Sequence, residues 1–492
     1  MPRKSHEMTE AKPFLSREVQ REFKEDDFDF ENLALEGGGS SAMAYVGAIR
    51  VLEELGWLRN IKRFAGSSAG SIVATFLAIG YNSQEIQKLF QRDFTPIMYD
   101  GSCMRCGQVV NLFRRLGAHP GKKLENWIAN NIKDKTGDKN YTFRQLYEKD
   151  HVELCILATD LSKMDTVYFH FKTTPDMPIY LAARASSSVP GLLKPVKWNK
   201  GVFVDGGVLC NYPLHVFDGW YLSMEEGDQF LKRFSDLAKV SEKWTTAERF
   251  GEPVNQKTLG VMTYSASDPV LMKDYMEKRT SQHKKVEIKA PKTKLHRKRD
   301  KQDKVNTKEV KEMAAALDRL ISALNNADTN RDGKVTRQEF MTFYKKKGSI
   351  LTKEDTKLLF GVVTSKNIAD AIFDRIDTDK SGEIEYKNIE RLAEQRGVSL
   401  AQTVRGYEDR NISDIKEFVS ALFETMMTHA QRVTEKSSDC SRTIGINTGY
   451  LGAFDWSMEK GDKDFLMECG KQAAVTFLRE LKQAPGIYPS VA

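Results

Sequence analysis

Short apolar runs alternate with longer segments of helical periodicity in the first half of the chain. Residues 32–36 and 61–65 are apolar runs typical of buried strands, and residues 41–55 and 69–79 carry apolar side chains at helical spacing. A strand, a helix and a second strand of these lengths form a βαβ unit, in which the strands are parallel and helices cover the sheet. The pattern therefore predicts an α/β fold with a mostly parallel sheet between helices.

Further runs of the same kind follow. The pattern predicts a helix over residues 179–185 and strands over residues 152–159, 166–171, 201–204 and 259–264. Strand-like sequence returns at residues 443–449, and a final helix is predicted over residues 464–481. A late strand needs a sheet to pair with, so we expect the last ~90 residues to rejoin the first domain.

Changes in composition divide the chain into five parts. Residues 1–28 are polar and predict a loose arm, and residues 29–282 hold the α/β pattern. Residues 283–308 have few apolar side chains and predict a disordered basic linker. Residues 309–397 are helical with two acidic loops, and residues 398–492 are the returning segment. The helical block is therefore expected to be an all-α insertion in the α/β domain.

Composition excludes fibrous, coiled-coil and disulfide-rich classes. Of the 492 residues, 40% are apolar and 29% are charged, which is an ordinary globular balance. Six cysteines without a dense framework favour a reducing, cytoplasmic setting. The N-terminal residues have no apolar core of a signal peptide, and no stretch approaches the ~18 apolar residues of a membrane span. Any contact with lipid is therefore expected to be peripheral, from the water side.

The net charge of +7 is concentrated in one segment. From Lys278 to Lys304 there are 12 Lys or Arg and 3 Asp or Glu, which gives +9, so the rest of the chain sums to −2. This segment is interpreted as a solvated linker, as a nuclear address at residues 297–299, or as a surface for anionic lipid headgroups. Each well-placed basic residue adds about 1 kcal/mol to such lipid binding. Because the positive net charge comes from this one segment, it does not indicate a nucleic-acid partner.

A candidate nucleophile lies between the second strand and the helix that follows it. Gly66, Ser68 and Gly70 fit the pattern G-x-S-x-G. The glycines permit a tight turn, and the turn exposes the central serine at the helix N-terminus. The neighbouring Ser67 is the alternative, but the central position favours Ser68.

A glycine run ends the first strand and opens the first helix. Gly37, Gly38 and Gly39 leave backbone N–H groups free at a helix N-terminus, which suits a phosphate or an oxyanion. No G-x-x-x-x-G-K-[ST] sequence is present here, so a nucleotide-binding loop is disfavoured. Together with Ser68, the run favours an oxyanion site.

A candidate base follows the strand at residues 201–204. Asp205 stands before two glycines, and we expect it at the carboxyl end of a parallel strand, where such sheets bind ligands. None of the eight histidines lies in an evident catalytic loop.

These motifs, in this order and spacing, resemble the patatin-like phospholipase family. The residues that carry the resemblance are Glu36-Gly-Gly-Gly-Ser-Ser-Ala, Gly66-Ser-Ser-Ala-Gly70, Asp205-Gly-Gly and, before the last, Ala185-Ser-Ser-Ser-Val-Pro-Gly191. The resemblance covers residues 28–282 and, more loosely, 440–485. It implies a three-layer α/β hydrolase that acts on acyl esters of phospholipids or acylglycerols.

The resemblance also implies a Ser–Asp dyad without a histidine. Ser68 would attack the ester carbonyl, Asp205 would accept its proton, and the N–H groups of Gly37 to Gly39 would hold the oxyanion. One alternative is a triad with His215, ten residues beyond Asp205. Another is a calcium-binding, lipid-docking adaptor whose hydrolase domain is inactive.

The first acidic loop matches the twelve-residue EF-hand pattern throughout. Its glycine, residue 333, stands at position 6, and the residue at position 8, Val335, can pair with a partner loop. The candidate calcium ligands are Asp328, Asn330, Asp332, Lys334 through its carbonyl, and Glu339.

The second loop follows the same pattern with one departure. Position 12 is Asn388, which cannot clamp a hard cation as a carboxylate does. Ile384 can pair with Val335, so a structural pair is expected even if one ion binds. The residues at its ligand positions are Asp377, Asp379, Ser381, Glu383 and Asn388. Calcium is expected to regulate activity or membrane association, or to be structural, and to take no part in the catalytic step.

One weaker motif remains. Cys103 and Cys106 form a lone C-x-x-C, with His119 the only near candidate for a third zinc ligand. Two incidental thiols are the favoured interpretation.

Overall fold

The computed structural model describes residues 13–25, 27–101, 116–223, 246–265, 272–282, 288–347, 351–361, 368–395, 421–423, 425–430 and 436–483. The chain forms two compact units. The first comprises Met1–Ala266, Val270–Thr293 and Asn411–Ala492, and the second comprises Ser267–Pro269 and Lys294–Arg410.

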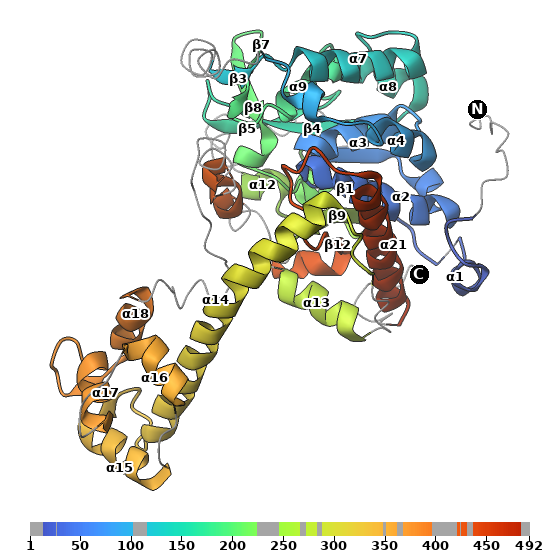
Figure 1. The fold of residues 1–492 in the computed structure, drawn as a ribbon. Coiled ribbons are helices and arrows are strands. Elements are labelled where there is room, and N and C mark those ends of the chain that lie inside the picture. Colours follow the sequence, from blue (N-terminus) through green and yellow to red (C-terminus); the bar gives the residue numbers. More distant parts are fainter. Residues whose placement is uncertain are drawn as a thin grey trace. The chain divides into compact units, whose positions relative to one another are not determined.

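A mixed sheet is the centre of the first unit (Figure 1). Its strands run in the order β12–β9–β1–β2–β4–β8–β7, and β5 also pairs with β4. The first five of these strands are parallel, whereas β5, β8 and β7 join by antiparallel pairing. The strands are β1 (Asn32–Leu35), β2 (Arg63–Ser67), β4 (Glu153–Asp160), β5 (Asp165–Phe169), β7 (Val196–Trp198), β8 (Gly201–Asp205), β9 (Thr258–Tyr264) and β12 (Thr443–Asn447); β3 (Gly117–His119) pairs separately with β6 (Gly191–Leu193).

Helices cover the sheet and bury its apolar strands. Every residue of β1 is buried, and nearly all of α3 is buried, as expected for a helix apolar on most sides. The helices are α1 (Arg17–Glu22), α2 (Met43–Glu54), α3 (Ser68–Ala78), α4 (Ser83–Phe90), α5 (Thr95–Met98), α7 (Lys122–Thr136), α8 (Phe143–Asp150), α9 (Ile179–Ser186), α12 (Thr246–Phe250), α13 (Lys273–Gln282) and α21 (Lys460–Gln483). Short 3₁₀ turns are η1 (Gly39–Ala42), η2 (Trp57–Asn60), η3 (Gly206–Val208), η4 (Leu214–Phe217) and η6 (Ser437–Arg442).

The end of the chain packs against its beginning within this unit. β12 pairs with β9, and α21 packs against α2. The two helices approach so closely that a Cβ at Gly470 would lie 1.9 Å from the carbonyl oxygen of Ala44. A larger residue at this crossing would separate the helices, so the glycine fixes where the returning segment packs.

The second unit is helical. It contains α14 (Lys294–Ala327), α15 (Arg337–Lys347), α16 (Lys353–Phe360), α17 (Ile368–Ile376) and α18 (Tyr386–Gln395), and a two-stranded sheet of β10 (Val335–Thr336) and β11 (Glu383–Ile384). Leu320, Leu324, Phe340, Phe373 and Ile376 are among the buried residues of its own core.

The expected loose linker differs from the structure. α14 begins at Lys294, so residues 294–308 are helical rather than disordered, and residues 283–287 lie outside the described part. Lys and Arg are good helix formers, and Asp300 precedes Lys304 by one helical turn, so charge alone does not prevent a helix here. This helix continues into the apolar, alanine-rich residues 314–327, which propagate it.

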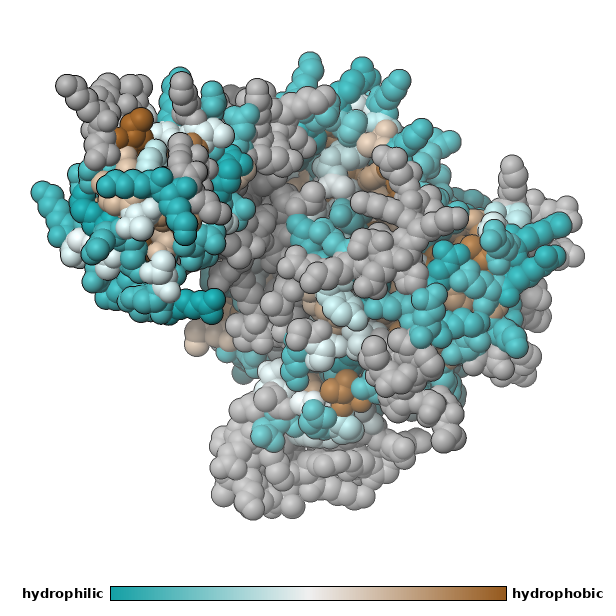
Figure 2. All heavy atoms as spheres, turned by 90° about the horizontal axis from the view of Figure 1, so that it is seen from below, coloured by the Kyte–Doolittle hydropathy of each residue, from teal (hydrophilic) through white to brown (hydrophobic). Residues whose placement is uncertain are grey.

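The face of the molecule in Figure 2 is mostly polar where side chains are described. Hydrophilic residues predominate on the face in Figure 2, with hydrophobic residues in small separate groups. Scattered apolar residues of this kind are normal for a protein surface. None of the described helices is long and apolar enough to cross a membrane.

Candidate active site and calcium loops

Ser68 occupies a strained turn between β2 and α3. Its φ is +49°, a left-handed conformation that costs free energy for any residue with a Cβ. A Cβ at Gly66 would lie 2.5 Å from the carbonyl carbon of Gly70, and a Cβ at Gly70 would lie 2.3 Å from the carbonyl oxygen of Glu36. Both flanking positions of the turn therefore need glycine. The alternative nucleophile, Ser67, is fully buried within β2.

Ser68 contacts a buried carboxylate directly. Its Oγ lies 2.7 Å from Oδ2 of Asp205, and Oδ1 of Asp205 accepts a hydrogen bond of 2.8 Å from the N–H of Gly207. Burial raises the pKa of Asp205 to about 7, while the hydrogen bonds from Gly207 and Ser68 and the charge of Arg184 act in the opposite direction. A carboxylate with a pKa near neutral is a far better base toward an alcohol than an exposed aspartate.

The strand that carries Asp205 runs in the opposite direction to the one expected. β8 is antiparallel to β4, with Asp205 opposite Ala158. The expectation that Asp205 ends a parallel strand is therefore wrong. β2 is parallel to β4 and places Ser67 opposite Leu157. The last residues of β2 and β8 therefore lie opposite adjacent residues of β4.

His215 lies in an apolar environment. Its ring packs edge-on against Tyr168 and Phe250, and burial lowers its pKa to about 4. Its Nε2 lies 3.3 Å from the hydroxyl of Tyr168. Among the residues that the structure describes, no hydrogen bond joins a histidine to Ser68 or Asp205.

The glycine loop offers fewer free N–H groups than the sequence suggests. The N–H of Gly37 donates to the carbonyl oxygen of Asn211 at 3.0 Å, so the expectation that it holds an oxyanion is wrong. Within the described part of the chain, no hydrogen bond engages the N–H of Gly38 or Gly39. These two groups are therefore the donors that the loop can offer to a ligand.

Asn211 is a site residue that the sequence analysis did not identify. Its Nδ2 donates to the carbonyl oxygen of Gly37 at 2.9 Å and to Oε1 of Glu36 at 3.1 Å. It stands six residues after Asp205 and connects the glycine loop to the loop that follows β8. Nothing in its local pattern distinguishes it from an ordinary turn asparagine.

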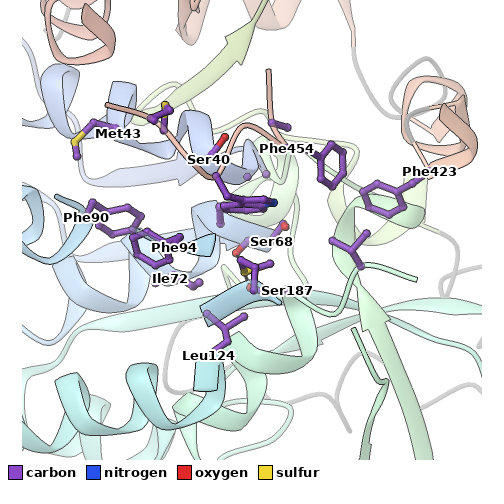
Figure 3. A pocket seen from close by; sticks show the side chains of 18 of the residues that line it. Ser40, Met43, Ser68, Ile72, Phe90, Phe94, Leu124, Ser187, Phe423 and Phe454 are labelled. Atoms are coloured by element: carbon purple, nitrogen blue, oxygen red, sulfur yellow. Dashed lines mark hydrogen bonds between the residues drawn. The ribbon is translucent and has the colours of Figure 1, made fainter. Parts of the chain in front are cut away.

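An apolar pocket opens beside Ser68. Its empty volume is about 920 Å³, which includes open solvent at its mouth. Figure 3 shows Phe90 and Phe94 on one side of Ser68, and Phe423 and Phe454 on the other. Other apolar residues that line it are Met43, Ile72, Met98, Leu124, Trp127, Val189, Met427, Trp456 and Met458.

The two acidic loops pair as the sequence predicts. Val335 of the first loop lies opposite Ile384 of the second in an antiparallel bridge, which confirms the predicted contact. In the first loop, the φ of Gly333 is +81°, and the carboxylate of Asp328 accepts hydrogen bonds from the N–H groups of Asp332 and Gly333. The loop therefore turns sharply around the side chain at its first position.

The first loop has oxygen donors of the right type for Ca²⁺. Asp328, Asn330, Asp332 and Glu339 supply side-chain oxygens, and Lys334 supplies a carbonyl. In the described part of the chain, no three acidic, histidine or cysteine side chains converge as a formed metal cluster. Both oxygens of Glu339 accept hydrogen bonds from Thr329 and Thr336, so this carboxylate must exchange those partners to reach an ion.

The C-x-x-C motif falls between the described residues 101 and 116. Cys103 and Cys106 lie outside the described residues. His119 is buried, and its Nδ1 accepts a hydrogen bond of 3.1 Å from the N–H of Gly101. Burial also lowers the pKa of His119.

Comparison with known families matches both parts of the chain. Residues 33–218 match the model of the patatin-like phospholipases, and residues 320–344 and 368–390 match the EF hand. Residues 33–218 are a patatin-like phospholipase domain. This patatin-like domain contains β1 to β8, and with them Ser68, Asp205 and the glycine loop.

Viral and bacterial proteins are similar to this part of the chain. An uncharacterized protein of Acanthamoeba polyphaga mimivirus is 38% identical over 197 residues, which are 40% of this chain and 64% of that protein. An uncharacterized protein of Bacillus subtilis (strain 168) is 35% identical over 37% of this chain and 64% of its own length. A probable lipid hydrolase of Invertebrate iridescent virus 6 is 26% identical over 38% of this chain and 63% of its own length. The chain thus spans less than two thirds of these curated relatives.

Two solved bacterial structures are more distant. VipD from Legionella pneumophila has a TM-score of 0.38 and 14% identity, over 92% of this chain and 67% of VipD. ExoU in the ExoU–SpcU complex from Pseudomonas aeruginosa has a TM-score of 0.27 and 25% identity, over 33% of this chain and 37% of that chain.

Proposed function

We propose that the protein is a lipid acyl hydrolase, of phospholipase A or acylglycerol lipase type, that uses Ser68 and Asp205 as a dyad. The observation that carries the proposal is the 2.7 Å contact between Ser68 Oγ and Asp205 Oδ2 beside an apolar pocket. The match of residues 33–218 to the patatin-like phospholipases and the similarity to a probable viral lipid hydrolase support it.

The first chemical step forms an acyl-enzyme. Asp205 accepts the proton of Ser68 Oγ as the oxygen attacks the ester carbonyl. The N–H groups of Gly38 and Gly39 stabilise the negative charge that develops on the carbonyl oxygen. The proton on Asp205 then passes to the alkoxide of the leaving group, and the ester C–O bond breaks.

The second step releases the fatty acid. Asp205, again a carboxylate, takes a proton from a water molecule that attacks the acyl-enzyme. The bond to Ser68 breaks, and the proton returns from Asp205 to Ser68 Oγ. A pKa of about 7 allows Asp205 to be both acceptor and donor near neutral pH.

The pocket supports a fatty acyl chain as the group next to the scissile bond. Its walls are aromatic and aliphatic, and it opens beside Ser68. An acyl chain in such a pocket gains about 0.8 kcal/mol for each buried methylene. Phospholipids and acylglycerols are the proposed substrates for this reason.

Calcium is proposed to regulate this hydrolase rather than to act in its chemistry. The first EF-hand loop would hold the ion through Asp328, Asn330, Asp332, Glu339 and the carbonyl of Lys334. When bound, the ion supplies a positive charge that draws the loop oxygens together. We also propose that the protein binds the surface of a membrane through the basic residues from Lys278 to Lys304. A cytoplasmic setting also stays a prediction.

One experiment tests the hydrolase directly. Fatty acid release is measured from a panel of phospholipids and acylglycerols, with and without Ca²⁺, alongside labelling by a serine-reactive fluorophosphonate. We expect release from at least one lipid class and labelling that is absent in Ser68→Ala. A folded chain that binds Ca²⁺ and lipid vesicles but releases no fatty acid and takes no label would instead be the calcium-binding adaptor.

A further inference from the structure

Three consecutive serines, beginning with the last residue of α9, each contact one of the candidate catalytic residues. Ser186 Oγ accepts a hydrogen bond of 2.8 Å from the N–H of Ser68. Ser187 Oγ donates to the carbonyl oxygen of Ser68 at 3.3 Å, and the carbonyl oxygen of Ser188 accepts a bond of 3.0 Å from the N–H of Asp205. One short segment therefore contacts the backbone of both the nucleophile and the base.

This segment is itself anchored to its surroundings. Ser188 Oγ accepts a hydrogen bond from Arg184, whose side chain is only 1% exposed. The same guanidinium donates to the carbonyl oxygens of Gly121 at 3.0 Å and of Lys194 at 3.0 Å. Arg184 thus ties the serine segment to the start of α7 and to the loop after β6, so the segment is held in place rather than free to follow Ser68.

Ser186 contacts the residue of the turn whose backbone is strained. Ser68 has a φ of +49°, and a residue persists in that conformation only where its surroundings hold it. Its N–H group donates to the hydroxyl of Ser186, a residue that is fully buried. Without Ser186 Oγ, a buried N–H would lose its partner, and the turn could relax.

We propose that Ser186 is a positioning residue for the nucleophile: its hydroxyl holds the N–H of Ser68 so that Ser68 Oγ stays within hydrogen-bond distance of Asp205. The proposal rests on the hydrolase function proposed above. It predicts an effect on the rate of acylation rather than on substrate binding, because Ser186 contacts the nucleophile and is not among the residues that line the pocket.

The test compares Ser186→Ala with Ser83→Ala, using a soluble short-chain ester. Ser83 is also a fully buried serine, but it is hydrogen-bonded to Glu53 at the start of α4. The kcat is expressed per active site titrated with fluorophosphonate, so a partly unfolded sample does not distort it. We expect Ser186→Ala to lower kcat by about tenfold to a hundredfold with KM within twofold, and Ser83→Ala to leave both unchanged.

A second variant covers the case in which Ser186→Ala does not fold. Ser186→Cys keeps a side chain of similar shape with a weaker hydrogen-bond acceptor, and it should show the same direction of change. An unchanged kcat in either folded variant, or an equal loss in Ser83→Ala, would overturn the role of Ser186. An inactive wild-type protein would overturn the hydrolase proposal instead, so the two failures are distinct.

A second, independent observation concerns the EF-hand loop that begins at Asp377. The ammonium of Lys387 lies 3.2 Å from Oδ2 of Asp379 and 3.0 Å from Oε2 of Glu385. The ammonium of Lys334, from the first loop, lies 3.0 Å from the other oxygen of Glu385.

The last position of this loop does not fit a calcium ion. Asn388 is fully buried, its Oδ1 accepts a hydrogen bond of 2.8 Å from the N–H of Glu385, and its Nδ2 has no partner within the described residues. An EF-hand ion takes two oxygens from this position, whereas the carboxamide has one oxygen, which is already bonded.

We infer that Lys387 stands in for a cation in the second loop, which therefore binds no Ca²⁺ but still pairs with the first loop through Ile384 and Val335. The second loop, stable without an ion, would then hold the first loop in a conformation that binds a single ion. Changing Asn388 alone would then not create a second calcium site, because Lys387 would still form ion pairs with Asp379 and Glu385.

Calorimetric titration of the full chain with CaCl₂ tests this inference. We expect one bound ion in the wild type and in Asn388→Glu, and two in Asn388→Glu combined with Lys387→Met. Lys380→Met combined with Asn388→Glu is the matched control, because Lys380 lies in the same loop without a described ion pair, and it should bind one ion. Binding of the first ion shows that the pair of EF-hand loops is folded. If a variant with Asn388→Glu loses that ion, Asn388→Asp is used in its place. Two ions in the wild type or in Asn388→Glu, or one in the folded double variant, would overturn the inference.

Discussion

Ser67 and Asp205 lie opposite consecutive residues of β4, Leu157 and Ala158, although their strands run in opposite directions. Strand β4 has two edges, and β5 pairs with one of them along residues 156–160. β2 and β8 must therefore both pair with the opposite edge. The two strands therefore meet end to end. Their meeting point brings Ser68, the residue after β2, within 2.7 Å of Asp205.

This arrangement predicts that both residues of the dyad are essential and that His215 is not. Ser68→Ala and Asp205→Asn should each lower ester hydrolysis by at least about 10³-fold, because each removes a reacting group. His215→Ala should keep most of the activity, since His215 packs against Tyr168 and Phe250. Release of fatty acid is the measurement, with folding checked by circular dichroism. A folded His215→Ala variant without activity would support a triad.

The environment of Asp205 predicts an acid limb in the pH profile. The base is active when it is deprotonated, and burial raises its pKa to about 7. The kcat/KM should therefore rise about tenfold per pH unit below pH 7 and level off above it. His215, with a pKa of about 4, is already neutral in this range, so His215→Ala should keep the same limb. A profile flat from pH 5 to 8 would contradict the assignment of Asp205 as the base.

The glycine loop predicts a large effect of a side chain at Gly38. A Cβ there would lie 2.7 Å from the hydroxyl of Tyr45 and 2.8 Å from Oγ1 of Thr263, so the backbone must shift. Gly38→Val should reduce kcat by about 10²-fold or more, because its N–H donor moves away from the oxyanion. Steady-state kinetics per titrated site is the check, and an unchanged kcat would place the oxyanion elsewhere.

The pocket predicts a dependence on acyl chain length. Phe423 is 4% exposed, packs against Phe454 and lines the pocket beside Ser68. Phe423→Leu should raise KM for long-chain esters several-fold and leave short-chain esters unchanged, since only long chains reach this wall. Phe143→Leu, a buried substitution in α8 away from the lining residues, is the control. Equal effects on short and long chains would argue against an acyl pocket here.

The first EF-hand loop predicts calcium binding that depends on Glu339. Glu339→Gln removes one of the two oxygen ligands at position 12 and should abolish most binding in calorimetry. We also expect Ca²⁺ to change the rate of hydrolysis or the partition onto anionic vesicles, because the loop pair lies within the sequence of the hydrolase. Tight binding with no change in either measurement would leave calcium with a structural role.

The sequence by itself determined the local features of this protein. The periodicity of residues 32–79 specifies a strand, helix, strand and helix, because each pattern reflects burial of neighbouring residues along the chain. The spacing around Ser68 and the pattern at Asp328 likewise specify a tight turn and an EF-hand loop, in which the contacts are only a few residues apart.

The tertiary structure decided which distant groups meet. It reversed the expected direction of the strand at Asp205, engaged the N–H of Gly37 with Asn211, and brought Ser186 to the nucleophile. The hydrogen bonds of Ser68 with Ser186 and Asp205, and of Gly37 with Asn211, join residues more than 100 positions apart in the sequence. They depend on strand register and on which edge of β4 is free. A local pattern carries no information on that choice, because register is fixed by the packing of the whole sheet.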